Sequence, residues 1–200
     1  AANVTRQVQK MRKAVKLALQ HDFSILSEAH SLKGRADALR LPPSLSAWWS
    51  DGTAASAGVG ILVKRDFLKR FPDTDPITCW EEVVKGRIAI LHLKGPEGDL
   101  DIFCCYLTTG DGGDSPIARQ NEISMIGNHI QPQDSVLTIL TGDFNFVEQV
   151  RDRFNVDTGG WTRARDHREG TRWHDAIRRP HSMHEWDQPH FIFNNGHCRS

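Results

Sequence analysis

Asp143 and Asn145, within the segment Gly142-Asp143-Phe144-Asn145, are the side chains of this sequence best suited to chemistry. On an extended backbone, side chains two positions apart project to the same side, so a carboxylate and a carboxamide with this spacing can act together. The carboxylate can orient or deprotonate a water molecule, and the amide can donate a hydrogen bond to a phosphoryl oxygen. The pair therefore favours metal-assisted hydrolysis of a phosphate ester, although both residue types are also frequent in turns.

Glu28 and Tyr106 are two further candidates, because each lies at or near the end of an apolar run. Mg²⁺ prefers one or two carboxylates together with water and substrate phosphate. Glu28 is thus a candidate metal ligand, Tyr106 a donor to the phosphate, and Asp143 the group that handles the attacking water. Taken singly, Glu28 also fits a surface carboxylate, and Tyr106 a core aromatic with a satisfied hydroxyl. Their shared position at strand ends favours a site.

Hydrophobic periodicity and turn residues predict the elements that position these side chains. An amphipathic helix is expected within residues 1–20, with an apolar face formed by Val4, Val8, Met11, Val15 and Leu19. Strands are expected at residues 23–26 and 58–63, in a hairpin at 87–94 and 99–107, at 135–141 and at 191–193. A helix is expected at 116–130, with loops at 42–52 and 108–115 and an irregular polar stretch at 161–189.

The order of these elements predicts an α/β fold with mixed sheets. No internal repeat or linker divides the chain, so residues 1–200 are expected to form one domain. In α/β proteins, ligands bind in the crevice outside the carboxyl ends of the strands. The candidate side chains are therefore expected to meet at one edge of the sheets.

Composition excludes several classes of protein. The 200 residues are 38% hydrophobic and 25% charged, which is typical of a globular domain. No apolar run approaches the ~20 residues of a membrane helix, and the basic N-terminal stretch is not followed by the apolar core of a signal peptide. The four cysteines form no CxxC pair, which favours reduced thiols in an intracellular protein. A zinc site formed by Cys198 and nearby histidines is the alternative.

The distribution of charge leaves the binding partner open. Formal net charge is zero, which neither requires nor excludes nucleic acid. Basic residues are concentrated within residues 1–20 and 151–179. Each stretch is compatible with a phosphate-contacting surface. The alternatives are a solvated helix face for residues 1–20 and a salt-bridged loop for residues 151–179.

Five segments resemble motifs of the endonuclease/exonuclease/phosphatase superfamily. Residues 25–30, Ile-Leu-Ser-Glu-Ala-His, resemble its LQETH-type metal-binding segment, and residues 58–63 resemble its GGVAI strand. Cys105-Tyr106-Leu107 resembles its VYxP strand, and residues 142–145 match its GDFN motif. Arg199-Ser200 is similar to the start of its SRIDR motif. Within the superfamily, the resemblance is closest to the endonuclease domains of non-LTR retrotransposons.

The resemblance implies a four-layer sandwich, with two β-sheets face to face and helices outside. It also implies hydrolysis of phosphodiesters or phosphomonoesters with Mg²⁺ or Mn²⁺. Glu28 would then be the metal ligand and Tyr106 a phosphate contact. Asp143 would position or activate water, and Asn145 would donate to a phosphate or to the transition state. The implied partner is nucleic acid, with DNA favoured, and no interaction with a membrane is implied. The implied location is inside the cell, with the nucleus as one candidate compartment.

The chain departs from the pattern of the superfamily in three places. The opening strand with its Asn, and the closing Asp and Asp-His pair, have no counterpart in these 200 residues. Thr108 and Thr109 stand where many relatives have Pro-Asn. We therefore expect a piece of a longer polypeptide, linked to further domains and inactive by itself.

Three hypotheses for function follow. The first is a metal-dependent endonuclease of a retroelement-like protein. The second is a phosphatase or phosphodiesterase that acts on a small phosphate, such as an inositol phosphate or a phospholipid headgroup. The third is a decayed domain that binds nucleic acid at most. The presence of Glu28, Asp143 and Asn145 favours the first.

Overall fold

The fold is that of a computed structural model, which describes residues 12–28, 41–52, 58–110, 112–132, 134–148, 154–155, 157–161, 166–186 and 198–199. The chain divides into two compact units. The first consists of Ala1–Leu107 and Gln131–Phe144, and the second of Thr108–Ile130 and Asn145–Ser200. Each unit is thus built from two separate stretches of sequence. Whether residues 1–200 fold as one domain stays a prediction.

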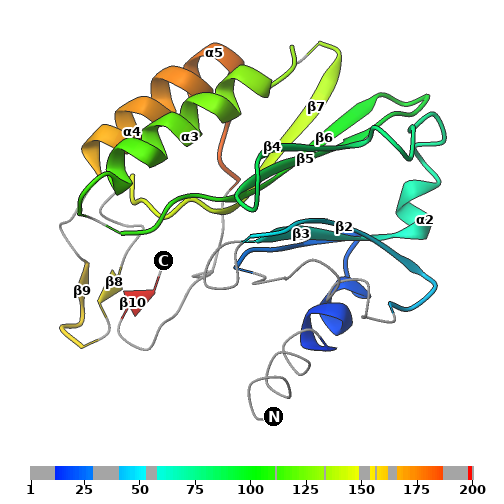
Figure 1. Ribbon diagram of the computed structural model, residues 1–200, viewed down its shortest axis with the longest axis horizontal. Coiled ribbons are helices and arrows are strands. Elements are labelled where there is room, and N and C mark those ends of the chain that lie inside the picture. The colour runs from blue at the N-terminus through cyan, green and yellow to red at the C-terminus, as the bar shows by residue number, and fades with distance from the viewer. Residues whose placement is uncertain are drawn as a thin grey trace. The chain divides into compact units, whose positions relative to one another are not determined.

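The first unit contains an antiparallel sheet in the order β1-β3-β2 (Figure 1). Its strands are β1 (Phe23–Leu26), β2 (Leu45–Ser50) and β3 (Val59–Lys64). The central strand β3 is buried on both faces over Val59–Val63, as its nearly continuous apolar sequence requires. Gly60 gives room for the ring of Trp49 on β2, because a Cβ at position 60 would overlap that ring. Since β1 and β2 both run antiparallel to β3, their carboxyl ends lie at the same edge.

The first unit also contains a mixed sheet in the order β4-β5-β6-β7. Its strands are β4 (Trp80–Val84), β5 (Ile88–Leu93), β6 (Asp99–Tyr106) and β7 (Val136–Asp143). The first three strands form an antiparallel meander, whereas β7 is parallel to β6. The sequence predicted mixed sheets, and one of the two main sheets is mixed while the other is wholly antiparallel.

The two sheets pack face to face, and their facing side chains form one hydrophobic core. β3 supplies Val59, Ile61 and Val63, and the other sheet supplies residues that include Leu91 and Ile102. The short helix α2 (Arg65–Leu68) follows β3 directly, and its Phe67 and Leu68 pack at the margin of this core. On the opposite face of β3, a helix at residues 12–18 rests its Ala18 against Leu45 and Leu62.

The second unit is built mainly from helices. α3 (Ser115–His129) lies beside α4 (His167–Trp173), which continues through the π-helical segment η2 (His174–Arg178) into α5 (Arg179–His181) (Figure 1). The two helical stretches approach closely at Gly127, where a Cβ would overlap the carbonyl oxygen of Ala176. The unit also has a small antiparallel sheet in the order β10-β8-β9, whose strands are β8 (Phe154–Asn155), β9 (Gly160–Trp161) and β10 (Cys198–Arg199).

The structure differs from the sequence-based expectations in three places. Residues 45–50 form a strand inside the expected loop, and Trp80–Val84 forms an edge strand that the pattern did not predict. Residues 167–181 are helical, although the polar stretch 161–189 was expected to be irregular. These elements lack a clear hydrophobic period because pairing with a neighbouring element, rather than an apolar stripe, determines their structure. The expected strand at 191–193 and the start of the first helix lie outside the described residues.

In the part of the chain that the structure describes, none of the helices has both the length and the apolar character needed to cross a bilayer.

His92 on β5 lies between two carboxylates on the neighbouring strands. Its Nδ1 is 2.7 Å from Oδ1 of Asp101 on β6, and its Nε2 is 3.2 Å from Oε2 of Glu81 on β4. Asp101 is only 3% exposed. The hydrogen bond to Asp101 raises the pKa of His92, the charges of both carboxylates and the bond to Glu81 add to it, and burial opposes it. The folded protein therefore binds this proton more tightly than the unfolded chain does.

This His92 contact predicts a pH-dependent stability. Because the pKa is raised on folding, the extra stability is full below the unfolded pKa of about 6.5 and is lost as pH rises through the folded pKa. We expect His92→Gln to remove this dependence and to cost about 1–2 kcal/mol at about pH 6. Urea unfolding at about pH 6 and about pH 8.5 measures it. Glu81→Gln is the matched control and should retain most of the dependence. An unchanged pH dependence in His92→Gln would contradict the assignment.

Candidate active site

A hydrogen bond between Tyr106 and Glu28 joins the two sheets at one edge. Tyr106 is the last residue of β6, and Glu28 lies two residues beyond the end of β1. The Tyr106 hydroxyl donates to Oε1 of Glu28 over 2.5 Å. The Tyr106 side chain belongs to the core between the sheets, whereas Glu28 is exposed. Glu28 also has a left-handed backbone, with φ 51°, where the chain turns out of the strand.

Burial and nearby charges keep the Tyr106 phenol protonated. Burial comes first, followed by the hydrogen bond to Glu28 and the charges of Glu28 and Asp143, and together they raise the pKa of Tyr106 to about 12. The charge of Arg87 opposes this rise. At neutral pH the phenol is therefore a hydrogen-bond donor, never an anion, and it lies within the electrostatic reach of both carboxylates.

Asp143 ends β7 directly beside Tyr106. The two residues are partners in the parallel register of β6 and β7, and the Leu107 N–H donates to the carbonyl oxygen of Asp143 over 2.9 Å. Because neighbouring parallel strands end together, the phenol and this carboxylate share one sheet edge. Three of the residues that the sequence predicted, Glu28, Tyr106 and Asp143, are thus brought together within the first unit.

Gly142 is required by the packing of β7 against β6. Its φ is 139°, a conformation that other residues rarely adopt. A Cβ at this position would overlap the backbone of Cys105, its partner in the register. The glycine that precedes Asp143 therefore lets the two strands stay paired up to the end of β7.

Asn145 belongs to the second unit, and its backbone differs from the sequence-based expectation. β7 ends at Asp143, and Asn145 has φ 52°, in the left-handed region. An extended backbone through residues 143–145, from which both side chains would point to the same side, was expected, and this expectation is wrong at Asn145. Asn tolerates the left-handed conformation better than most residues, so part of its suitability at this position is conformational.

Comparisons with known proteins bear on the fold. No family model matches the sequence, and no curated protein matches it. The structure is similar to that of the AP endonuclease LMAP from Leishmania major, with a TM-score of 0.64 and 13% identity, over 94% of this chain and 69% of the other. It is also similar to an AP endonuclease from Archaeoglobus fulgidus, with a TM-score of 0.53 and 13% identity, over 88% of this chain and 69% of the other.

A third similar structure is that of humanised D. rerio TDP2, with a TM-score of 0.50 and 16% identity, over 82% of this chain and 67% of the other. The chain has the fold of the endonuclease/exonuclease/phosphatase superfamily. The predicted α/β fold, with two sheets and flanking helices, is thereby confirmed. The closer resemblance to retrotransposon endonucleases stays a prediction.

Arg87 lies at the sheet edge where Tyr106 meets Glu28, and the sequence analysis did not single it out. It precedes β5, and its guanidinium lies 5.5 Å from the centre of the Tyr106 ring. Nη1 of Arg87 donates to the Tyr106 carbonyl oxygen over 3.3 Å, and the Tyr106 N–H donates to the Arg87 carbonyl oxygen over 2.7 Å. The hairpin register could have revealed it, because pairing residues 88 and 105 places residue 87 beside residue 106.

The donor set suits Mg²⁺ or Mn²⁺ better than zinc. Among the described residues, no group of three or more His, Cys, Asp or Glu side chains is arranged to hold a metal ion. A hard cation of this kind needs only one or two carboxylates, with water and phosphate completing its shell. Glu28 is exposed, and a carboxylate that accepts a hydrogen bond at Oε1 can still bind a cation through Oε2. These residues therefore fit such an ion.

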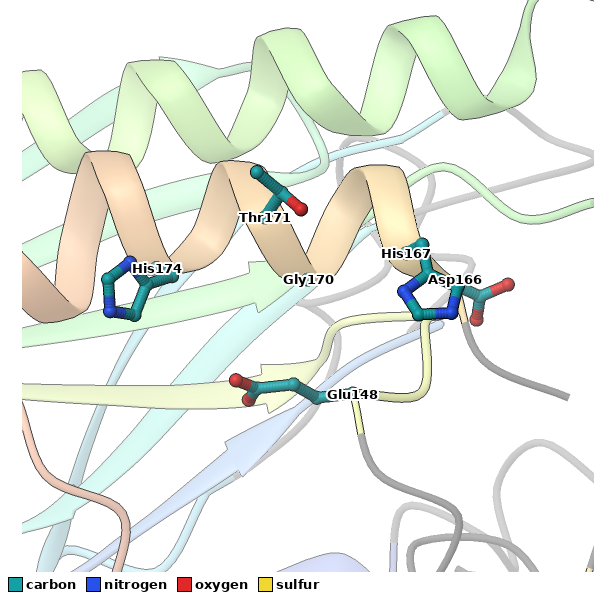
Figure 2. A pocket seen from close by; sticks show the side chains of 6 residues that line it. All are labelled: Glu148, Asp166, His167, Gly170, Thr171 and His174. Carbon is teal, nitrogen blue, oxygen red and sulfur yellow. The ribbon is translucent and has the colours of Figure 1, made fainter. Parts of the chain in front are cut away.

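A separate groove lies in the second unit, along one side of α4 (Figure 2). It encloses about 280 Å³ and is lined by Glu148, Asp166, His167, Gly170, Thr171 and His174. Its acidic side chains have structural partners, because Asp166 Oδ2 accepts from the Val147 N–H over 2.7 Å and Glu148 lies 2.9 Å from Arg178. The groove is thus supported by contacts that hold residues 147–148 to Asp166, just before α4, and to Arg178 at the end of η2.

The Tyr106 environment predicts an unusual titration. Tyr106 is the single tyrosine of the chain, so phenolate absorbance reports on it alone. We expect less than half ionisation at about pH 11, since the pKa is raised from 10 to about 12. Glu28→Gln should lower the midpoint, because it removes a negative charge while burial remains. A midpoint that Glu28→Gln leaves unchanged would show that the phenol does not contact Glu28.

The close approach at Gly142 predicts a large loss of stability on substitution. We expect Gly142→Ala to destabilise the fold by at least about 3 kcal/mol, since backbone overlap adds to the strain of a positive φ. Gly98→Ala is the matched control: Gly98 has φ 124°, but no atom of the described residues lies within 4 Å of a Cβ there. That control should cost only about 1–2 kcal/mol. Urea unfolding of both variants separates overlap from strain, and equal losses would refute the overlap.

Proposed function

We propose that the chain is a metal-dependent phosphodiesterase domain that acts on nucleic acid, DNA in the first place, as an endonuclease. The observation that supports this best is the meeting of Glu28, Tyr106 and Asp143 at one edge of the two sheets. It combines a candidate cation ligand, a protonated donor and a candidate base, which are the groups that hydrolysis of a phosphate diester requires.

Each side chain takes a role that its environment allows. Glu28 would hold Mg²⁺ or Mn²⁺, and such an ion, when bound, would supply polarisation of the phosphate and neutralisation of its charge. The Tyr106 phenol, kept protonated, donates to a phosphoryl oxygen. Asp143 orients the attacking water and accepts its proton. Asn145 donates its amide to the phosphate.

Arg87 adds a positive charge beside Tyr106. Its guanidinium lies against the phenol ring and is anchored at the Tyr106 carbonyl. An arginine fixed in this way attracts a phosphate without the entropy loss of ordering a free side chain. It also compensates part of the negative charge of the two carboxylates, which would otherwise repel a polyanion.

The choice of nucleic acid over a small phosphate rests on the comparisons. Two of the similar structures are named AP endonucleases, and the likeness extends over most of this chain. The sequence resemblance to retrotransposon endonucleases favours the same substrate class. It also favours a longer parent polypeptide with further domains, working inside the cell and in the nucleus.

Cleavage of supercoiled plasmid in the presence of Mg²⁺ tests the proposal. The chain and a form extended at both ends along its parent polypeptide are compared, because activity is expected in the extended form. We expect Asp143→Asn to lower nicking about 10²–10⁴-fold, the usual contribution of a general base. Asp73→Asn, at an exposed carboxylate of the first unit, is the matched control and should leave nicking unchanged.

The other outcomes of this experiment separate the alternatives. Release of inorganic phosphate from soluble phosphomonoesters without nicking would favour a small-phosphate enzyme. Salt-sensitive binding to DNA without turnover in the extended form would favour a non-catalytic domain. Equal nicking by Asp143→Asn and wild type would exclude Asp143 as the base.

A further inference from the structure

The hydroxyl of Tyr106 carries a single proton, and this proton is already committed to Glu28. The O–H donates to Oε1 of Glu28 over 2.5 Å, at the short end of the range for a bond between a hydroxyl and a carboxylate. Because a phenol has only one donor, it cannot make an equally short bond to a second anion at the same time. The phosphate contact of Tyr106 therefore requires the bond to Glu28 to be given up.

The Tyr106 ring is fixed, so the direction of its O–H bond is the part that can change. Tyr106 is 5% exposed, and it packs in the core between the sheets. Its N–H donates to the Arg87 carbonyl oxygen over 2.7 Å, and its carbonyl oxygen accepts from Nη1 of Arg87 over 3.3 Å. Rotation about the C–O bond redirects the proton without moving a heavy atom. A phosphoryl oxygen that accepts it must therefore lie within hydrogen-bond distance of the same hydroxyl, near Glu28.

Two anions then meet at one hydroxyl group. If the Glu28 carboxylate and a phosphoryl oxygen each lie within about 3 Å of the hydroxyl oxygen, they lie within about 6 Å of each other. Like charges at this separation oppose binding of the phosphate. A divalent cation on Glu28 removes the repulsion, and it also replaces the phenol as the partner of the carboxylate. Glu28 is exposed, so an ion can reach it from solvent.

We propose that the Tyr106 phenol couples the binding of a divalent cation to the binding of phosphate, because it holds Glu28 in the empty site and is released to the phosphoryl oxygen once a cation takes its place. This coupling rests on the proposed function, since it concerns the same cation and the same phosphate. It adds two properties to that function. The cation is needed for tight binding of the phosphate and not only for its hydrolysis, and the phenol competes with the cation when phosphate is absent.

Binding of Mn²⁺ alone to the form extended at both ends tests the competition. Free Mn²⁺ is followed by its electron paramagnetic resonance signal in the absence of nucleic acid. We expect Tyr106→Phe to bind Mn²⁺ about three- to tenfold more tightly than wild type, because the ion no longer displaces a hydrogen bond from Glu28. A purely structural role of Tyr106 predicts weaker or unchanged binding. Glu97→Gln, at an exposed carboxylate just before the other end of β6, is the matched control and should bind Mn²⁺ as wild type does.

Binding of a labelled DNA duplex tests the coupling. Kd is measured in EDTA and in Mn²⁺, with every variant made in the Asp143→Asn background so that hydrolysis does not interfere. We expect Mn²⁺ to lower Kd about tenfold or more when Glu28 is present. Glu28→Gln should bind more tightly than its parent in EDTA, because the repulsion is gone, and Mn²⁺ should change its Kd less than about twofold. Tyr106→Phe should weaken binding in Mn²⁺ but not in EDTA, where the phenol stays on Glu28.

The results separate this coupling from the proposed function. Mn²⁺ binding by Tyr106→Phe that is no tighter than in wild type overturns the coupling. So does a Glu28→Gln protein that keeps the full effect of Mn²⁺ on Kd, and this variant alters an exposed side chain that folding does not require. Both binding results without nicking by the extended wild type support the coupling while the proposed function fails. Nicking with neither binding result has the opposite meaning, and absence of Mn²⁺ binding in the extended wild type overturns both.

Discussion

The hydrogen bond from Tyr106 to Glu28 is the contact on which the candidate site depends. It connects two sheets that share an apolar core, at the edge where β1 and β6 end, and the Gly86 N–H that donates to the Ser50 hydroxyl is a second polar link between them. Because an apolar interface has no directional preference, directional bonds such as this one contribute to the alignment of the two strand ends. Burial and this bond together raise the pKa of Tyr106 and keep the phenol protonated, so the same contact contributes to both the alignment and the electrostatics of the site.

Strand register has a comparable effect within the second sheet. The parallel pairing of β6 and β7 places Asp143 beside Tyr106, and Gly142 permits it because no side chain fits against the backbone of Cys105. A shift of one residue would turn Asp143 to the other face of the sheet. The segment Gly142-Asp143-Phe144-Asn145 thus combines a packing requirement at its first position with a chemical group at its second.

The second unit relies on buried charge where the first relies on apolar packing. Arg119 on α3 and Glu169 on α4 form an ion pair that is almost fully buried, and Glu122 holds the adjoining loop. Helices joined in this way need no continuous apolar stripe. This explains why residues 167–181 look irregular in the sequence, since the hydrophobic period by which a helix is usually recognised is weak there. The groups that stabilise the helix pair are polar and lie far apart in the chain.

Local sequence patterns predicted the candidate chemical groups and most of the elements: a carboxylate after the strand at 23–26, a phenol near the end of the hairpin, and a carboxylate after a buried run. These follow from local patterns, because alternation, turns and strand ends are written in neighbouring residues. The contact of Tyr106 with Glu28, 78 positions away, arises from the packing of the two sheets and is not visible in any local pattern. The tertiary structure also added Arg87, and it replaced the assumed extended backbone at Asn145 with a left-handed one. The reason is that sheet register and sheet packing bring distant residues together, and no short segment encodes them.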